Sequence, residues 1–453
     1  MEHTVDLLVI GTGTAGCLLA LSCRKAGLQV AVVDNRAYGG TCGMRGCEPQ
    51  KYLVEAAQVA HLSQQMSETG IHPAARLDWP ALIRSKSAFT DAVPERTERI
   101  LREAGVQLFY GSARFLSPAE VAIDEETRIL ARDVVIATGA KPARLAFPGA
   151  ELAITTDDFM ELAALPRRVL FIGAGCLSLS FAHVARAAGA AVTILQRGER
   201  ILRRFDAELA GQLASSAQGL GISIVTGVTA SMAENSHGAF ITYGKGGCSE
   251  AFPSDLIVNT SGRVADLEGL HLEAGEVASS ARGVTVNKFM QSVSNPRVWA
   301  VGDACDSPFQ LATVADLEAE VAAENIIKGK LRSPDYHGVP TVVFAQPPLA
   351  GVGLTEAQAK ESGIRYRINR GAMDSWPSSR QIGQPHAFFK VLIEAGSDKI
   401  LGAHLFGHNA GEVINIFALA IKAGLSTHDL KKVLWAYPTY VSDLKHMISD
   451  QPA

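Results

Sequence analysis

Apolar and polar residues follow the same order twice along this chain, and that order predicts a mixed α/β fold. Each copy consists of an apolar run, a glycine-rich turn, a helical run and a second apolar run. The first copy has these elements at residues 5–10, 11–16, 17–25 and 30–34, and the second has them at 169–172, 173–175, 176–188 and 192–195. Continuous apolar strands that alternate with helices are typical of a parallel sheet covered on both faces. The pattern therefore predicts two Rossmann-like dinucleotide-binding domains.

The rest of the chain has other patterns. Residues 51–105 are predicted to be helical, with breaks at Pro80 and Pro94, and residues 106–136 alternate as short strands do. From about residue 338 onward we expect strands at 339–344, 388–393 and 400–405, followed by a helix at 410–423. This change of pattern predicts a separate C-terminal α+β domain.

Composition and charge argue against several functional classes. Hydrophobic residues make up 47% of the 453 residues and charged residues 19%, as is usual for a globular enzyme. The formal charge of −4, without a Lys/Arg-rich run, argues against a nucleic-acid partner. Glycine or polar residues interrupt each candidate apolar stretch, so no membrane span is expected. The N-terminal residues do not resemble a signal peptide, and we therefore expect a cytoplasmic protein.

The first glycine-rich turn predicts a nucleotide site. Gly11, Gly13 and Gly16 allow a tight turn, close approach of a pyrophosphate to the backbone, and close packing of helix on strand. The pyrophosphate would bind at the helix N-terminus, where free N–H groups point at it. Asp34 ends the second strand, where an acidic side chain can bind a ribose hydroxyl. A plain tight turn is the alternative, but the strand, the helix and the acid together favour a nucleotide.

The second glycine-rich turn is a variant of the first. Gly173 and Gly175 are kept, whereas Ser178 stands at the third glycine position, and serine is small enough for slightly looser packing. No acid ends the second strand, and Arg197 and Arg203 follow it instead. A 2′-phosphate needs positive charge and would be repelled by a carboxylate, so these arginines favour NADPH over NADH. The alternative is a solvated basic surface loop.

Two cysteines, Cys42 and Cys47, lie close together after the first nucleotide unit. Seven cysteines in a long chain without a secretion signal indicate a reducing compartment, where a close pair is redox-active or metal-binding. Zinc would need two further ligands, and no matching Cys or His pair is present, so no metal site is expected. Lys51 and the start of a helix favour a reactive thiolate. The other cysteines are isolated, and Cys17 and Cys23 are expected in the core: Cys17, Cys23, Cys176, Cys248 and Cys305.

The chain resembles class I pyridine nucleotide-disulfide oxidoreductases, the family of glutathione reductase, dihydrolipoamide dehydrogenase and mercuric reductase. The most specific motif is the segment around the cysteine pair, residues 39–51. Further motifs match in order along the chain, at residues 137–139, 260–263, 299–303, 339–348 and 351–355. The resemblance implies a flavoprotein that uses FAD and a nicotinamide cofactor. It also implies a homodimer in which the last domain forms the interface and completes the partner's active site.

The resemblance further implies roles for individual residues. Cys47 would face the flavin as the charge-transfer thiol, Cys42 would attack the substrate as the interchange thiol, and Asp303 would bind the flavin ribityl chain. The remaining implied contacts to FAD are Gly11, Gly13, Gly16, Asp34, Thr41, Thr138, Gly139 and Gly302. The implied architecture has four parts, namely an FAD domain at 1–142, an NADPH domain at 143–262, a central part completing the FAD domain at 263–335, and a dimerisation domain at 336–453.

Three positions depart from the family pattern. Tyr437 stands where the family has a histidine base, and Ser442 stands where the family has the acid that orients it. A phenol, with a reference pKa of about 10, is a poor proton acceptor at neutral pH, although it can donate a hydrogen bond. Ser180 replaces the glutamate that pairs with the family lysine matched by Lys51. We therefore expect an unpaired Lys51 that favours negative charge on the reduced flavin.

Other residues near these positions have simpler interpretations. Tyr437 could serve only to pack in a dimer interface beside Trp435 and Tyr440, because aromatic residues are common there. Asp443 could orient Tyr437 or a water molecule, or be a solvated acid. His404 and His408 are expected to be structural histidines with satisfied hydrogen bonds.

These observations lead to one main hypothesis and two alternatives. The main hypothesis is an NADPH-dependent reductase that passes hydride to FAD, electrons to the Cys42–Cys47 disulfide, and then reduces a small disulfide or soft electrophile. Mercuric reductase also has tyrosine at the histidine position but uses a C-terminal cysteine pair that this sequence does not show, so a metal-ion reductase is the first alternative. The second alternative is an electron-relay or redox-sensing flavoprotein for a protein partner. Retention of both cysteines and the flavin motifs argues against a retired homologue.

Overall fold

The computed structural model describes residues 1–236, 239–245 and 249–449, so Cys248 lies outside the described residues. The chain forms two compact units, each assembled from three separate segments. Unit 1 comprises residues 1–49, 84–143 and 263–336, and unit 2 comprises residues 50–83, 144–262 and 337–453. No helix in the described part of the chain is long and apolar enough to cross a membrane. The division into four domains stays a prediction.

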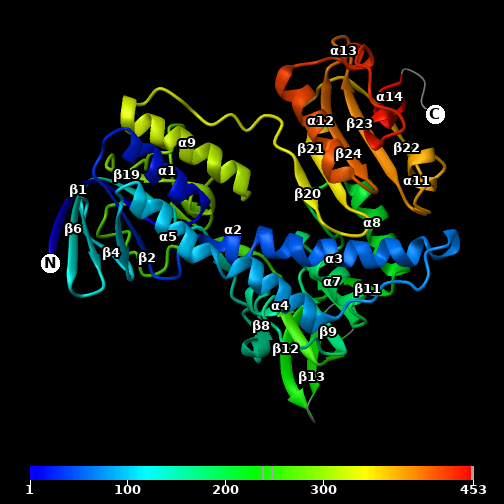
Figure 1. The fold of residues 1–453 in the computed structure, drawn as a ribbon, viewed down its shortest axis with the longest axis horizontal. Helices are drawn as coiled ribbons and strands as arrows, with labels where there is room; N and C mark the ends of the chain where they lie inside the picture. The colour runs from blue at the N-terminus through cyan, green and yellow to red at the C-terminus, as the bar shows by residue number, and fades with distance from the viewer. Residues whose placement is uncertain (237–238, 246–248, 450–453) are drawn as a thin grey trace. The chain divides into compact units, whose positions relative to one another are not determined.

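Unit 1 is built on a seven-stranded sheet with strand order β3-β2-β1-β6-β5-β4, in which β19 also pairs with β6 (Figure 1). Its parallel strands are β1 (Glu2–Ile10), β2 (Val30–Asp34), β3 (Gln107–Tyr110), β6 (Thr127–Ile136) and β19 (Val298–Ala300). The antiparallel strands are β4 (Ala113–Ser117) and β5 (Glu120–Ile123). Ile10 lies opposite both Val33 and Ile136, so β1, β2 and β6 end together. The first glycine turn follows β1 at that edge.

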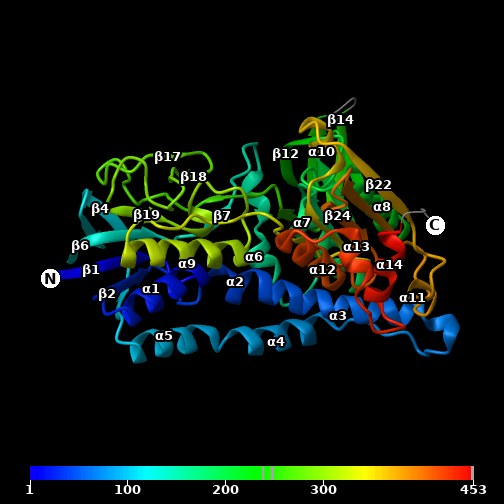
Figure 2. The same ribbon diagram turned by 90° about the horizontal axis from the view of Figure 1, so that it is seen from above.

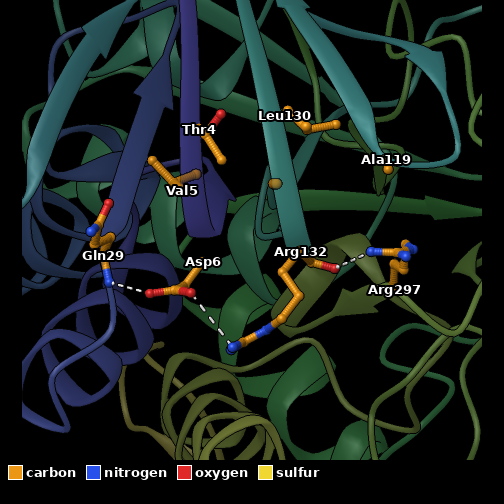
Figure 3. A pocket seen from close by; sticks show the side chains of 9 residues that line it. Thr4, Val5, Asp6, Gln29, Ala119, Leu130, Arg132 and Arg297 are labelled. Carbon is orange, nitrogen blue, oxygen red and sulfur yellow. Dashed lines mark hydrogen bonds and ion pairs between the residues drawn. The ribbon is translucent and has the colours of Figure 1, made fainter.

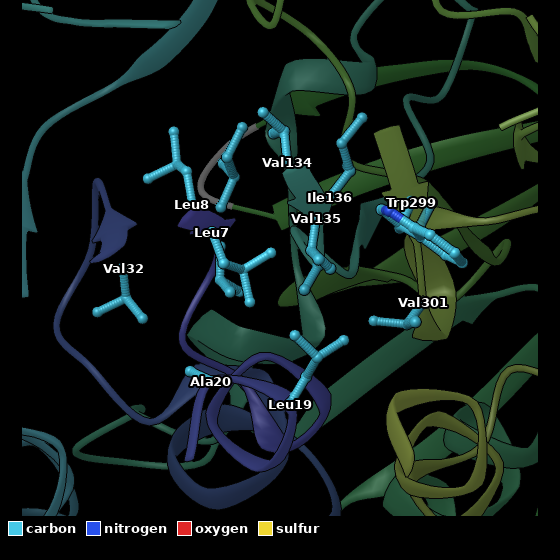
Figure 4. Packing of buried hydrophobic residues seen from close by; sticks show 14 of the residues in the cluster. Leu7, Leu8, Leu19, Ala20, Val32, Val134, Val135, Ile136, Trp299 and Val301 are labelled. Carbon is cyan, nitrogen blue, oxygen red and sulfur yellow. The ribbon is translucent and has the colours of Figure 1, made fainter. Parts of the chain in front are cut away.

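Apolar side chains hold the helices of unit 1 on this sheet. The helices α1 (Thr14–Lys25) and α9 (Ala312–Lys328) lie side by side (Figures 1 and 2). Figure 4 shows Leu19 of α1 beside Leu7 of β1 and Val135 of β6, and all three are completely buried. Burial of one such side chain stabilises the fold by about 2 kcal/mol. This packing fixes the helix that begins at the glycine turn.

Unit 2 contains a second parallel sheet, with strand order β11-β10-β9-β15-β8. Its strands are β8 (Ala153–Ile154), β9 (Arg168–Ile172), β10 (Ala191–Gln196), β11 (Ile222–Thr226) and β15 (Leu256–Asn259). The crossover helices are α7 (Cys176–Ala187) and α8 (Ala207–Gly219). Together with the sheet of unit 1, this confirms the predicted pair of Rossmann-like domains. The antiparallel strands β12 (Thr229–Ser236), β13 (Ala239–Lys245) and β14 (Ser249–Ser254) were not predicted, because β12 for example has a single buried residue and little apolar pattern.

The C-terminal part of unit 2 is the predicted α+β domain. Its antiparallel sheet has the order β20 (Thr341–Val343), β21 (Leu349–Gly353), β24 (Ile400–Phe406), β23 (Phe388–Glu394), β22 (Tyr366–Ala372). The long helix α12 (Ala410–Ala423) packs on β21 and β24 (Figure 1), as the sequence predicted. Short helices complete the domain: α10 (Glu356–Glu361), α11 (Pro377–Arg380), α13 (Thr427–Lys431) and α14 (Leu444–Met447).

The segment after the first nucleotide unit is helical, as predicted. It forms α3 (Cys47–Gln65), α4 (Trp79–Thr90) and α5 (Val93–Glu103). The predicted breaks at Pro80 and Pro94 are confirmed, because a new helix begins at each and the proline is its second residue. Proline is tolerated there because the N–H that it lacks has no partner in the first turn.

Candidate active site

The first glycine turn packs so closely that a side chain would fill it. A Cβ added to Gly11 would lie 2.3 Å from the carbonyl oxygen of Ala137, and one added to Gly16 would lie 2.1 Å from that of Gly11. Gly13 stands before α1 without a side-chain cap, so the first N–H groups of the helix have no side-chain acceptor. Close backbone and free N–H groups are what a pyrophosphate requires, and the turn therefore fits FAD.

Asp34 has the position that a ribose-binding acid needs, and a neighbour fixes its orientation. Its Oδ2 accepts hydrogen bonds from the backbone N–H of Thr12 at 2.8 Å and from the Thr12 hydroxyl at 2.7 Å. The N–H of Arg36 donates to Oδ1 at 3.0 Å. A carboxylate has about four acceptor positions, so capacity for a ribose hydroxyl remains. Thr12 was not predicted from the sequence, although it lies within the glycine motif.

Two further motifs of unit 1, which contain Thr138 and Asp303, lie at the same edge of the sheet as the first glycine turn. The backbone N of Thr138 is 3.1 Å from the position of a Cβ on Gly11, and the Thr138 hydroxyl is buried with no hydrogen-bond partner among the described residues. A bound nucleotide would satisfy that hydroxyl. Burial raises the pKa of the Asp303 carboxyl, and the positive charge of Arg263 opposes this shift.

A buried glutamate supports the Asp303 turn. Glu318 on α9 accepts hydrogen bonds from the N–H of Gly302 at 2.7 Å and from the Tyr336 hydroxyl at 2.8 Å. Glu318 was not singled out from the sequence, because an acid in an otherwise ordinary helix gives no signal. The turn that carries Asp303 is therefore held from α9.

The two candidate redox cysteines are hydrogen-bonded to each other as free thiols. Cys42 lies in α2 (Gly40–Arg45), and Cys47 is the first residue of α3. The hydrogen bond from Cys42 and the backbone N–H of Cys47 lower the pKa of Cys47 to about 7, against the opposing effect of burial. The same hydrogen bond, followed by burial, raises the pKa of Cys42. Near neutral pH the pair can therefore hold a thiolate at Cys47 and a proton on Cys42.

The expectation of an unpaired Lys51 is wrong. Its ammonium forms an ion pair with Glu55, one helical turn later on α3, and lies 4.5 Å from the centre of the Phe344 ring. The pair arises because residues four apart are neighbours on a helix. With the Lys51 side chain 43% exposed, the pair is worth about 0.5 kcal/mol. Lys51 is thus paired with a residue of its own helix, and the sequence already contained this signal.

The second glycine turn repeats the first with different side chains. A Cβ added to Gly173 would lie 2.5 Å from the carbonyl oxygen of Thr260, whereas one added to Gly175 would meet nothing within 4 Å. At the end of β10, Gln196 Oε1 accepts the N–H of Ala174 at 3.1 Å. An amide thus stands where the first motif has a carboxylate. The missing acid was visible in the sequence, but its replacement by glutamine was not predicted.

Both arginines predicted to bind a 2′-phosphate are exposed beside this turn. Arg197 follows Gln196 directly, and Arg203 lies further along the same loop. Gln196 Nε2 donates to the carbonyl oxygen of Arg200 at 3.2 Å, and Arg200 in turn donates to that of Arg203 at 3.0 Å. The loop is therefore ordered from the end of β10, with its charged side chains facing solvent.

Two buried serines of α7 replace larger or smaller family residues. The Ser178 hydroxyl is completely buried and has no partner in the described part of the chain. Ser180 is also completely buried, and its hydroxyl donates to the carbonyl oxygen of Cys176 at 3.0 Å. Ser180 therefore carries no charge toward Lys51.

The tyrosine of the C-terminal motif, Tyr437, is exposed to solvent. Tyr437 is 71% exposed, and the Lys445 ammonium lies 5.4 Å from the centre of its ring. Ser442 is engaged elsewhere, because its hydroxyl donates to the carbonyl oxygen of Thr439 at 2.5 Å. Asp443 accepts a hydrogen bond from Ser378, and burial raises its pKa. Asp443 is thus neither a fully solvated acid nor a hydrogen-bond partner of Tyr437.

His404 and His408 both contact groups of the protein. His404 is buried, and its Nε2 lies 3.0 Å from the carbonyl oxygen of Leu354. The rings of His408 and Tyr440 are in contact at an angle of 52°, with centres 5.1 Å apart. The other cysteines of the described chain differ in burial: Cys23 and Cys305 are buried, Cys17 is partly buried, and Cys176 is exposed. No group of three or more metal-ligating side chains is found among the described residues.

A hollow in unit 1 lies at the other edge of its sheet (Figure 3). Its lining includes the start of β1, whereas the glycine turn follows the end of β1. Arg132 pairs with Asp6 at 3.5 Å, and Asp6 also accepts the N–H of Gln29 at 2.8 Å. Arg297 donates to the carbonyl oxygen of Arg132 at 3.4 Å. The charged side chains that line this hollow are thus already engaged by other groups of the protein.

Comparisons with known proteins cover nearly the whole chain. Residues 5–319 match the family described as pyridine nucleotide-disulphide oxidoreductase, and residues 339–448 match its dimerisation domain. The glutathione reductase of Burkholderia cepacia is 32% identical over 98% of both chains. The mercuric reductase of Lysinibacillus sphaericus is 31% identical over 98% of this chain and 82% of that protein. The dihydrolipoyl dehydrogenase 3 of Pseudomonas aeruginosa is 32% identical over 99% of this chain and 98% of that protein.

A solved structure has the same fold. It is the Cu(II) complex of the HOCl-induced flavoprotein disulfide reductase RclA from Escherichia coli, with a TM-score of 0.88. The match covers 98% of this chain and 99% of that one at 24% sequence identity. The predicted α/β fold with a C-terminal domain is thereby confirmed.

Proposed function

Because the chain belongs to the pyridine nucleotide-disulphide oxidoreductase family, we propose that it is an NADPH-dependent reductase of a small disulfide or another soft electrophile. The family resemblance found in the sequence is confirmed. The chain is thus an FAD-dependent oxidoreductase that uses NAD(P)H, and its dimerisation domain indicates a homodimer. The substrate and the roles of individual residues belong to the proposal.

The observation that carries the proposal is the hydrogen-bonded pair of Cys42 and Cys47. The proposed holders of FAD are the first glycine turn, Asp34, Thr138 and Asp303, for which the close backbone and the buried Thr138 hydroxyl give support. When bound, FAD accepts hydride from the nicotinamide and delivers two electrons to a disulfide. The pair of thiols is then the form that reacts with substrate.

In the proposed thiol reaction, protons and electrons move only between the two cysteines and the substrate. The proton of Cys42 crosses to Cys47, and the Cys42 sulfur attacks one sulfur of the substrate disulfide, which releases the first product thiolate. Cys47 then passes its proton to the first product thiolate and attacks Cys42 in the mixed disulfide, which releases the second product as a thiolate and forms the Cys42–Cys47 bond. The substrate gains two electrons and the pair loses two. The shared hydrogen bond supports this proton transfer.

Tyr437 is proposed as a hydrogen-bond donor to the leaving thiolate. Its hydroxyl can donate, and its 71% exposure within the dimerisation domain leaves it accessible. Ser442 is committed to Thr439, so no acid orients a base at this position. We therefore expect reactions that need little proton transfer from an added base.

NADPH is the proposed nicotinamide cofactor. Gln196 presents a neutral amide where a carboxylate would repel a 2′-phosphate, and Arg197 and Arg203 are exposed on the loop that follows. NADH has no 2′-phosphate to pair with these positive charges.

Reduction of a soft metal ion is a second candidate. A metal ion held by two thiolates needs no proton donor, and the lack of a base at position 437 fits this chemistry as well as disulfide reduction. Relatives named mercuric reductase also support it.

Paired substitutions test the assignment of the two thiols. A thiolate beside oxidised flavin absorbs at long wavelength. We expect this absorption in NADPH-reduced wild type and in Cys42→Ser whose flavin is still oxidised, before NADPH is added, but in neither state of Cys47→Ser. Both variants should lose disulfide turnover. In the wild type the absorption should rise with pH around a midpoint of about 7, because Cys47 is a thiolate above its pKa. Retention of the absorption in Cys47→Ser would reject the assignment.

A substrate panel tests the reaction itself. Purified holoenzyme with NADPH is offered small disulfides, Hg²⁺, Cu²⁺ and quinones, and oxidation of NADPH is followed. Turnover of a small disulfide supports the proposal, whereas turnover of metal ions alone supports the second candidate. If none reacts although NADPH reduces the cysteine pair, a relay to a protein partner becomes the better interpretation.

A further inference from the structure

A buried lysine of the C-terminal sheet pairs with carboxylates at the start of α8. The Lys390 ammonium on β23 lies 3.0 Å from Asp206 Oδ1, 2.6 Å from Glu208 Oε2 and 3.1 Å from Glu356 Oε2. The side chains of Lys390 and Asp206 are only 2% and 4% exposed. Burial alone would lower the pKa of Lys390, but hydrogen bonds to Glu208 and Asp206 outweigh it and raise the pKa. Lys390 is therefore charged where it is buried.

Asp206 stands where the loop with the arginines ends. We call residues 197–205 the arginine loop, because it contains Arg197, Arg200, Arg203 and Arg204. Asp206 caps α8, since its Oδ1 accepts the N–H groups of Glu208 at 3.1 Å and Leu209 at 3.4 Å. Gln196 orders the start of the arginine loop through its hydrogen bond to the carbonyl oxygen of Arg200. The loop is thus fixed by an amide at one end and by a buried ion pair at the other.

We propose that Lys390 is a positioning residue for recognition of the NADPH 2′-phosphate, an inference that rests on the proposed preference for NADPH. Lys390 holds Asp206, and through it the end of the arginine loop, in one place. It also neutralises carboxylates behind the loop. Without it, Asp206 would be left buried without its cation, which is strongly disfavoured, beside the carboxylates of Glu208 and Glu356, which would keep their pairs with Arg370 and Lys360. Their charge would also oppose a bound phosphate.

The test compares two ligands that differ by the 2′-phosphate. Binding of adenosine 2′,5′-bisphosphate and of AMP to the FAD-loaded protein is measured by calorimetry for the wild type and Lys390→Met. We expect the bisphosphate to bind about fivefold more weakly and AMP to bind as before. With a disulfide substrate, the KM for NADPH should rise by a similar factor, while kcat at saturating NADPH is kept.

Lys360→Met is the matched control. Lys360 also pairs with Glu356, at 2.7 Å, but it is exposed and makes no contact with Asp206. The same substitution there should leave the binding of both ligands unchanged. If Lys390→Met does not fold, Lys390→Gln replaces it, since glutamine can still donate a hydrogen bond but carries no charge. It should weaken the bisphosphate and spare AMP.

Two results would overturn the inference. An equal loss for AMP and the bisphosphate would show that Lys390 only supports the fold, and unchanged binding of both would show that it has no role. The double variant Arg197→Ala with Arg203→Ala separates a failure of this inference from a failure of the proposed preference for NADPH. If that variant binds the bisphosphate as tightly as the wild type does, the NADPH assignment itself fails.

Discussion

The two glycine turns share a backbone framework but differ in the side chain that ends the second strand. In unit 1, Asp34 accepts the N–H of Thr12, and in unit 2, Gln196 accepts the N–H of Ala174. Each pair is separated by 22 positions. The framework needs an acceptor, and carboxylate and amide both provide one. We expect the charge that remains to determine which ligand is tolerated beside the turn.

The third position of each motif shows a second difference. Gly16 and Ser178 are both the third residue of the helix that follows the turn. A Cβ at Gly16 would collide with the carbonyl oxygen of Gly11, whereas Ser178 carries a Cβ in the second motif. The first turn is therefore the tighter one. Exchanging residues between the two motifs tests whether close packing or charge matters more for nucleotide binding.

The largest effect is expected for Gly16→Ser, which gives the first motif the residue of the second. The added Cβ would lie 2.1 Å from a backbone oxygen that cannot move without opening the turn. We expect a loss of about 3 kcal/mol in the free energy of unfolding and loss of most bound FAD. Flavin absorbance per chain and thermal unfolding measure both. A variant with full flavin content and unchanged stability would show that close packing is not required there.

An intermediate effect is expected for Gln196→Glu, which gives the second motif the charge of the first. The carboxylate can still accept the N–H of Ala174, so the fold should be unchanged. Repulsion should raise the KM for NADPH about tenfold, while the KM for NADH stays within about twofold. Steady-state kinetics with both nucleotides measure this shift, and Gln196→Ala controls for loss of the acceptor. An unchanged NADPH:NADH ratio would contradict the role given to charge.

The smallest effect is expected for Ser178→Gly, the reverse exchange. Glycine in a helix costs about 1 kcal/mol, but removal of a buried hydroxyl without a partner offsets this by about 1–3 kcal/mol. We therefore expect the unfolding midpoint in denaturant and the KM for NADPH to change little. A large loss of stability would mean that the Ser178 hydroxyl has a partner in solution.

Much of the fold could be predicted because its signals are local. The strand Val30–Asp34 and the helix Ala410–Ala423 match the prediction, since apolar residues mark both elements and Gly424 follows the helix. The strands β12 and β22 were missed because each has a single buried residue. The ion pair of Lys51 with Glu55 was missed although its four-residue spacing was visible.

The sequence by itself determined the two βαβ units, the cysteine pair and the family, because glycine spacing, apolar period and motif order are written along the chain. Only the tertiary structure decided that Gln196 replaces the acid of the second turn, that Glu318 supports Asp303, and that Lys390 ties down Asp206. In these pairs the partners lie from 16 to 184 positions apart. Such contacts depend on how strands and helices pack, and a local pattern does not encode them.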